Sequence, residues 1–193
     1  DSEFLQNNTN IGTKQSPIPV KLSTWACRTN KIRQARAACI HAGGITSVLN
    51  FVVCPFSSFE LPFFGADFVT LPNGHLIALD LQPALKDDEK HIKYVSNNLI
   101  SLHKKWQPLL PEGGLIPKDA EPYFSPAFLW SRIPLGAKSD SIIEDVLQPA
   151  FTDYLSFYLE LVRNSHEVSS DRSSMILKGQ KKYMKYRADK DPA

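Results

Sequence analysis

The chain has 193 residues, 42% of them hydrophobic, and this length suits one well-buried domain spanning residues 1–193 better than two of ordinary size. A formal net charge of +2 is too small to indicate nucleic-acid binding, and no apolar run approaches the roughly 20 residues that a membrane-spanning helix needs. The three cysteines, Cys27, Cys39 and Cys54, have neither disulfide-framework nor metal-ligand spacing, so we expect an intracellular protein without a metal centre.

The order of the predicted elements indicates the fold class. Residues 1–20 are polar, lack the features of a signal or transit peptide, and predict a flexible N-terminal extension. Short alternating runs come next, and longer runs with helical spacing follow them. We expect strands at 31–42, 46–55, 61–71 and 75–84, a candidate strand at 21–29, a long connection at 112–134, and helices at 87–110, 141–164 and 169–187. This order is typical of an α+β fold in which helices cover an antiparallel sheet.

The predicted turns place polar residues opposite one another in the middle of apolar strands. An Asn-Gly turn at 73–74 is a strong hairpin signal, and it predicts that Asp67 faces Asp80. A connection symmetric about residues 58–59 places Asn50 opposite Asp67. The three polar side chains then share one face of the sheet, because side chains two residues apart on a strand point the same way.

A turn at the glycine pair 43–44 extends this row by placing Ala37 opposite Asn50. The rest of the same face is mostly small, and the opposite face is apolar, as a sheet packed under helices requires. The small face holds Ala35, Cys39, Val48, Val52, Gly65, Val69, Ala78 and Gln82. The apolar face holds Ile40, Leu49, Phe51, Val53, Phe64, Phe68, Ile77, Leu79 and Leu81.

Polar groups that converge among small side chains are typical of a pocket for a flat organic molecule. A carboxylic acid shielded from water keeps its proton to higher pH, so Asp67 and Asp80 are candidates for proton transfer or substrate binding. Purely structural roles are equally open for Asn50 and Asp80, and Asp67 could instead cap backbone groups at a bulge near Gly65. Nucleotide-binding, serine-hydrolase and zinc-protease motifs do not occur in the sequence.

Several motifs together resemble one known family. They are NFVVCP, LPFFGADFVTLP and LIALDLQP in the predicted strands, YFSPAFLWSR at 123–132, and QKKYMKYRADKDPA at the end. From about residue 21 onward the chain resembles the ferredoxin-dependent bilin reductases, and within them the branch that forms phycoerythrobilin. The family's chains normally continue some tens of residues beyond KDPA, so we expect the C-terminal part to be incomplete here.

The resemblance implies a three-layer α/β/α sandwich with a central antiparallel β-sheet, holding an open-chain tetrapyrrole between the sheet and the C-terminal helices. It also implies an oxidoreductase with no bound cofactor, which receives single electrons from reduced ferredoxin and works through bilin radicals. The implied substrate is 15,16-dihydrobiliverdin, reduced at its A-ring diene. We further expect a monomer in a plastid stroma or cyanobacterial cytoplasm, with direct substrate transfer from the preceding bilin reductase as an option.

The resemblance also implies roles for individual residues. Asp67 matches the family's central catalytic aspartate, and Asp191 matches a second proton donor near the C-terminus. Asn50 occupies a position that is histidine in the phycocyanobilin-forming branch, which argues against that branch's four-electron chemistry. Arg187 matches a substrate-facing residue and Arg132 a propionate-binding arginine. The predicted substrate-binding residues are therefore Asn50, Asp80, Arg132 and Arg187.

Other interpretations of the same residues remain open. Within the family they are reduction of biliverdin at its 15,16 bridge and formation of phytochromobilin. A carrier that delivers bilin without reducing it is a third, although a carrier does not need a second proton donor. Basic residues also crowd the last segment, where they form either a solvated helix face or a surface that steers an acidic ferredoxin. They are Lys178, Lys181, Lys182, Lys185, Arg187 and Lys190.

Overall fold

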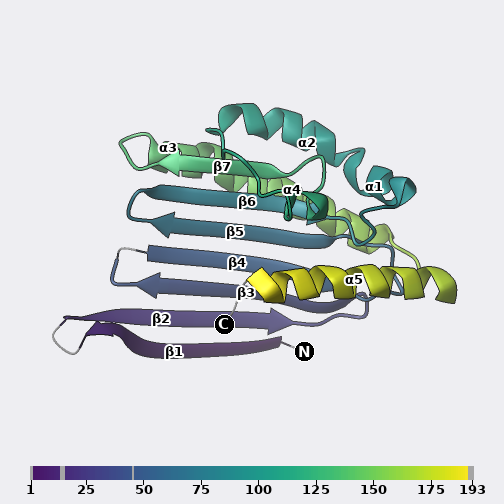
Figure 1. The fold of residues 1–193 in the computed structure, drawn as a ribbon, viewed down its shortest axis with the longest axis horizontal. Helices are drawn as coiled ribbons and strands as arrows, with labels where there is room; N and C mark the ends of the chain where they lie inside the picture. Colours follow the sequence, from purple (N-terminus) through teal and green to yellow (C-terminus); the bar gives the residue numbers. More distant parts are fainter. Residues whose placement is uncertain (1, 14–15, 45, 191–193) are drawn as a thin grey trace.

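The computed structural model describes residues 2–13, 16–44 and 46–190, and it contains one antiparallel sheet with helices on both faces (Figure 1). The seven strands lie side by side in the order in which they occur in the sequence. They are β1 (Ser2–Thr13), β2 (Ser16–Cys27), β3 (Ile32–Ala42), β4 (Thr46–Pro55), β5 (Phe63–Leu71), β6 (Gly74–Gln82) and β7 (Leu129–Pro134). The predicted α/β/α sandwich is confirmed.

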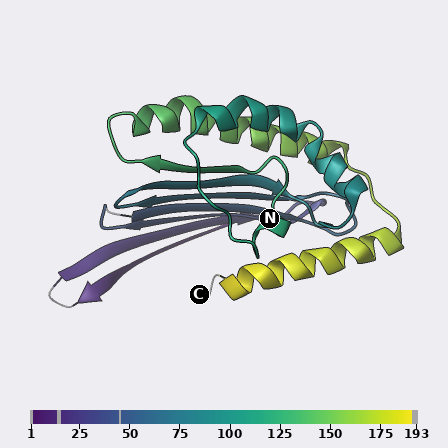
Figure 2. The ribbon, with the colours of Figure 1, turned by 45° about the horizontal axis from the view of Figure 1, so that its top comes forward.

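Most of the helices cover one face of the sheet, and one long helix covers the other, as Figure 2 shows. The face with most of the helices carries α1 (Glu89–Ser96), α2 (Leu99–Trp106), α3 (Ser139–Ile142), a π-helical turn (Ile143–Leu147) and α4 (Gln148–Asn164). The opposite face carries α5 (Ser170–Lys190). Short 3₁₀ turns occur at Gln107–Leu109 and Glu121–Tyr123. Among the described residues, no helix combines the length and apolarity needed to cross a membrane.

The main core lies between the central strands and α4. Phe151 of α4 packs against three phenylalanines of β4 and β5, with ring centroids 5.8–6.2 Å from those of Phe51, Phe64 and Phe68. Phe64 is fully buried, as are Leu79 and Leu81 of β6. The strand residues among these all belong to the predicted apolar face, so that face is confirmed in β4, β5 and β6.

The four strands predicted with short turns are confirmed, whereas three other predictions are wrong. Residues 1–20 do not form a flexible extension, because their described part forms β1 and the start of β2. Every residue of β1 is exposed, so this strand has no buried face. A strand without a buried face does not need alternating apolar residues, which are the usual sequence signal for a strand. The predicted connection 112–134 ends in strand β7, and the helix predicted at 87–110 breaks at Asn97 and Asn98.

The register is confirmed at the site's centre and wrong on either side of it. Asn50 pairs with Asp67, as predicted. Leu71 pairs with Gly74, so the turn is Pro72-Asn73 and Asp67 pairs with Ala78 instead of Asp80.

A three-residue connection separates β3 from β4, because Ala42 pairs with Thr46. This extra residue places Ala38 opposite Asn50 and moves the predicted Ala37 to the other face. The same shift puts Ile40 on the face that we predicted to be small and polar.

Helix α5 lies against the sheet through one narrow face. Its Ile176 and Tyr183 are buried with Phe63 of β5, and the Gln180 side chain donates a hydrogen bond to the Pro55 carbonyl. At Gly179 the helix passes so close to the end of β6 that an added Cβ would lie 2.0 Å from the Ala84 carbonyl oxygen. Glycine therefore sets how near α5 can approach the sheet.

We predict that Gly179→Ala destabilises the protein. At an exposed helical position this change stabilises by about 1 kcal/mol, but here the methyl group would push α5 off Ala84. Such overpacking costs about 1–3 kcal/mol. The measurement is the free energy of unfolding from urea denaturation, with Ser174→Ala, an exposed change in the same helix, as the control. A Gly179→Ala protein more stable than the unmodified chain would contradict this close approach.

Candidate active site

A chain of polar side chains crosses three strands and ends on α5. Arg36 of β3 donates a hydrogen bond of 2.9 Å to the Asn50 side-chain oxygen, and the Asn50 amide donates to the Asp67 carboxylate. The other Asp67 oxygen accepts a hydrogen bond from the Arg187 guanidinium, 3.4 Å away. One cation, Arg187, thus contacts the Asp67 carboxylate, and Arg36 is linked to it through Asn50. The Asp67 side chain remains 30% exposed.

Small residues flank this polar chain along the sheet. The row across the strands is Ala38, Asn50, Asp67 and Ala78, since each of these is paired with the next. The two alanines leave open space on either side of the amide and the carboxylate. A flat molecule can therefore lie on the sheet in contact with both polar groups.

Both arginines of the chain line a cavity of about 270 Å³ between the sheet and the C-terminal half of α5. Cys54 lies in its wall, where burial raises the pKa of the thiol and keeps it protonated at neutral pH. The residues that line the cavity are Gln34, Arg36, Val52, Cys54, Phe63, Tyr183, Met184, Arg187 and Ala188. Asp67 and Asn50 lie next to this cavity through their contacts with the two arginines.

Asp80 shares the Asp67 face of the sheet, but it is an anchor rather than part of this open site. Its side chain is 1% exposed and accepts hydrogen bonds from both the backbone N–H and the hydroxyl of Ser125. Burial raises the Asp80 pKa to about 7. The prediction that Asp80 faces Asp67 is wrong, and its two oxygens are used to hold the connection 112–128 onto the sheet.

The remaining predicted residues lie farther away or outside the described part. Arg132 is on β7, opposite Leu76 and on the same face as Asp67, two strands across and two residues along the sheet, or about 12 Å away. Its guanidinium lies 5.7 Å from the centre of the Trp130 ring. Asp191, the predicted second proton donor, lies outside the described residues. The structure thus brings together Asn50, Asp67 and Arg187.

Comparisons with known proteins identify the family of the chain. The family model for ferredoxin-dependent bilin reductase matches residues 3–193. The chain belongs to this family. Phycoerythrobilin:ferredoxin oxidoreductases from Synechococcus sp. (strain RCC307) and Prochlorococcus marinus (strain MIT 9211) are 58% and 59% identical to it over 191 residues, which is 99% of this chain and 73% and 74% of theirs.

A solved structure of another protein has a similar fold. The crystal structure of phytochromobilin synthase from tomato in complex with biliverdin aligns with a TM-score of 0.80 and 28% sequence identity. The alignment covers 97% of this chain and 68% of that one. Within the described part of the reductase, no three or more His, Cys, Asp or Glu side chains are grouped so as to hold a metal ion.

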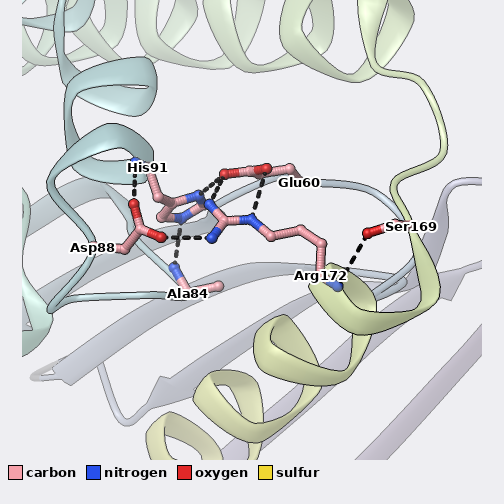
Figure 3. A network of polar contacts seen from close by, with 6 residues as sticks. All are labelled: Glu60, Ala84, Asp88, His91, Ser169 and Arg172. Atoms are coloured by element: carbon pink, nitrogen blue, oxygen red, sulfur yellow. Dashed lines mark hydrogen bonds and ion pairs between the residues drawn. The ribbon is translucent and has the colours of Figure 1, made fainter.

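A polar network that we did not predict from the sequence fixes the start of α5 (Figure 3). The Arg172 guanidinium forms ion pairs with Glu60, in the β4–β5 connection, and with Asp88, which caps α1. Hydrogen bonding to Arg172 is the main cause that lowers the pKa of each carboxyl group. Because the partners lie 84 and 112 residues from Arg172, no local spacing in the sequence indicates this network.

His91 of α1 completes the network in a defined neutral form. Its Nε2 accepts a hydrogen bond of 3.1 Å from the Ala84 backbone N–H, so the proton resides on Nδ1, which donates to Glu60. The side chain is fully buried, and this burial lowers the His91 pKa. The reductase therefore holds α1, the end of β6 and the β4–β5 connection together through one imidazole.

We also did not predict a role for Tyr183, which lies between two cavities of the reductase. Its hydroxyl hydrogen-bonds to the Gln82 side chain, its ring packs 4.7 Å from Phe63, and burial raises its pKa to about 12. It lines the cavity beside Arg187 and a larger one of about 660 Å³ between α5 and residues 83–90. The helical spacing of Ile176, Gln180, Tyr183 and Arg187 could have indicated it.

We predict that His91→Gln flattens the pH dependence of stability. The folded-state pKa of His91 lies below 6.5, so as the pH falls through 6.5 the unfolded chain binds a proton that the folded chain does not. The unmodified protein should therefore lose about 1 kcal/mol more of its free energy of unfolding than the variant does between about pH 7.5 and about pH 5.5.

Urea denaturation at several pH values measures this difference, with His166→Gln at an exposed position as the matched control. The variant is also expected to be less stable at every pH in this range, because the Ala84 and Glu60 contacts are weakened. Parallel stability profiles for the variant and the unmodified chain would show that His91 does not titrate differently on folding.

Proposed function

We propose that this reductase uses two electrons, delivered one at a time by reduced ferredoxin, to reduce the A-ring diene of 15,16-dihydrobiliverdin to phycoerythrobilin through bilin radicals. The observation that carries the choice of substrate is the identity of 58% over 191 residues with a phycoerythrobilin:ferredoxin oxidoreductase. The reaction would occur where reduced ferredoxin is supplied, in a plastid stroma or a cyanobacterial cytoplasm.

The geometry around Asp67 supports a proton-donor role within this proposal. Each two-electron reduction also consumes two protons, and a protonated bilin accepts an electron more readily than a neutral one. A flat bilin lying over Asp67 would remove water from the carboxylate, which favours its neutral acid form. Asn50 would then hold the acid in position from the neighbouring strand, since its amide already donates to Asp67.

The arginines are suited to the acidic end groups of the substrate. A linear tetrapyrrole of this class carries two propionates, and guanidinium groups bind carboxylates through paired hydrogen bonds. Arg187 is 3.4 Å from Asp67, a long contact that an incoming carboxylate can replace. We propose Arg132 as a second propionate partner and Asp191 as the second proton donor.

Product analysis tests the substrate assignment. We expect the purified chain, incubated anaerobically with 15,16-dihydrobiliverdin and reduced ferredoxin, to convert the pigment progressively to phycoerythrobilin, identified by chromatography. Biliverdin supplied in place of 15,16-dihydrobiliverdin should not yield phytochromobilin. A single absorbance shift without further conversion would indicate a bilin carrier and would overturn the proposed reaction.

We predict that Asp67→Asn separates binding from reaction. Asparagine keeps the size and polarity of the side chain but cannot donate the proton, and general acid catalysis contributes a factor of about 10² to 10⁴. The variant should still bind the bilin, seen as an absorbance shift, while its turnover with reduced ferredoxin falls at least about 100-fold.

The matched control is Asp145→Asn, which changes an exposed acid in the helical layer on the other side of the sheet. It should turn over at the rate of the unmodified chain. Full activity of Asp67→Asn would exclude Asp67 as the proton donor, whatever the identity of the product.

A further inference from the structure

Helix α5 has two faces of opposite character. The face against the sheet carries Ile176, Gln180, Tyr183 and Arg187, of which the first three are at most 6% exposed. Half a helical turn away, exposed lysines recur at intervals of three, one and three residues and therefore form one stripe. This lysine stripe consists of Lys178, Lys181, Lys182 and Lys185.

Two lysines of the stripe, Lys178 and Lys182, line a cavity that Asp87, Asp88 and Glu89 also line. Within the described ranges, no carboxylate forms an ion pair with any of the stripe's four lysines. Like charges three and four residues apart destabilise a helix, so a face that serves only solubility usually mixes both signs. The α5 sequence contains seven basic and two acidic residues, so basic charge predominates on this helix.

The helices on the other face of the sheet are mixed in charge, because α1 and α2 contain four lysines and one glutamate. From α3 to the end of α4 the sequence contains five acidic residues and one basic residue. These helices and α5 lie on opposite faces of the sheet (Figure 2). The excess of basic residues on α5 attracts an approaching acidic protein toward this helix.

The lysine stripe is also the outer surface of the helix that covers the active site. The inner side of α5 places Tyr183 and Arg187 against the cavity beside Asp67. An α-helix with its side chains is about 10–12 Å across. A protein docked on the stripe would therefore be separated from a bilin on the sheet by the thickness of one helix.

We propose that the lysine stripe is the docking surface for reduced ferredoxin. This inference rests on the proposed function. At each encounter the iron–sulfur cluster of ferredoxin loses one electron and the bound bilin gains it, and two encounters complete one reduction with the two protons. Oxidised ferredoxin must leave between them, and contacts made by exposed, mobile lysines favour fast association and release.

The test is charge reversal on the stripe, away from the cavity. Lys181→Glu with Lys185→Glu is compared with Lys104→Glu and Lys138→Glu, two exposed lysines of the helical layer on the other face of the sheet. Both double variants change the net charge equally. We expect the stripe variant to raise the KM for ferredoxin about tenfold or more at low ionic strength, with unchanged bilin binding by absorbance titration, and the control to match the unmodified chain.

Binding of reduced and oxidised ferredoxin to each protein, measured by calorimetry without bilin, makes the result independent of turnover. Loss of ferredoxin binding only in the stripe variant supports the docking surface even if the bilin reduction proposed above fails. Equal ferredoxin affinity in the stripe variant and the control would overturn the proposed docking surface, even if all proteins reduce the bilin normally. An equal loss in both double variants would also overturn it, because net charge alone would then explain the effect.

Discussion

The attachment of α5 to the sheet is the constraint on which the site depends. The network around Arg172 fixes the first turn of the helix to Glu60 and Asp88, and Gly179 allows its middle to touch the Ala84 carbonyl. Together with the buried contacts of Ile176, Gln180 and Tyr183, they hold α5 in its direction across the strands. This direction brings Arg187 beside Asp67.

This attachment lets one helix serve two purposes. Its inner side closes a cavity over the small, polar face of the sheet, and its outer side presents lysines to solvent. The main core between the sheet and α4 is separate and is built from aromatic side chains. The reductase can thus keep a roomy active-site face because its stability derives largely from the other face of the same strands.

Residues near one another in the sequence gave predictions that the structure confirms. The pairing of Asn50 with Asp67 follows from one symmetric connection, and the apolar face of β4, β5 and β6 follows from simple alternation. The errors come from turns whose length the sequence leaves ambiguous. One extra residue before β4 moved Ala37 to the other face, and a two-residue shift in the β5–β6 hairpin separated Asp80 from Asp67.

The sequence by itself determined the order of the four strands β3 to β6, the family and the acid at the centre of the sheet, because these depend on local patterns and motifs. Only the tertiary structure decided that Asp80 is an anchor for Ser125, that residues 2–13 add an edge strand, and that Arg172 joins α5 to the β4–β5 connection and to α1. These features depend on contacts between segments up to 112 residues apart or on backbone pairing with no buried face. Neither long-range contacts nor such backbone pairing produces a periodic pattern in the sequence, because both depend on how whole helices and strands pack together.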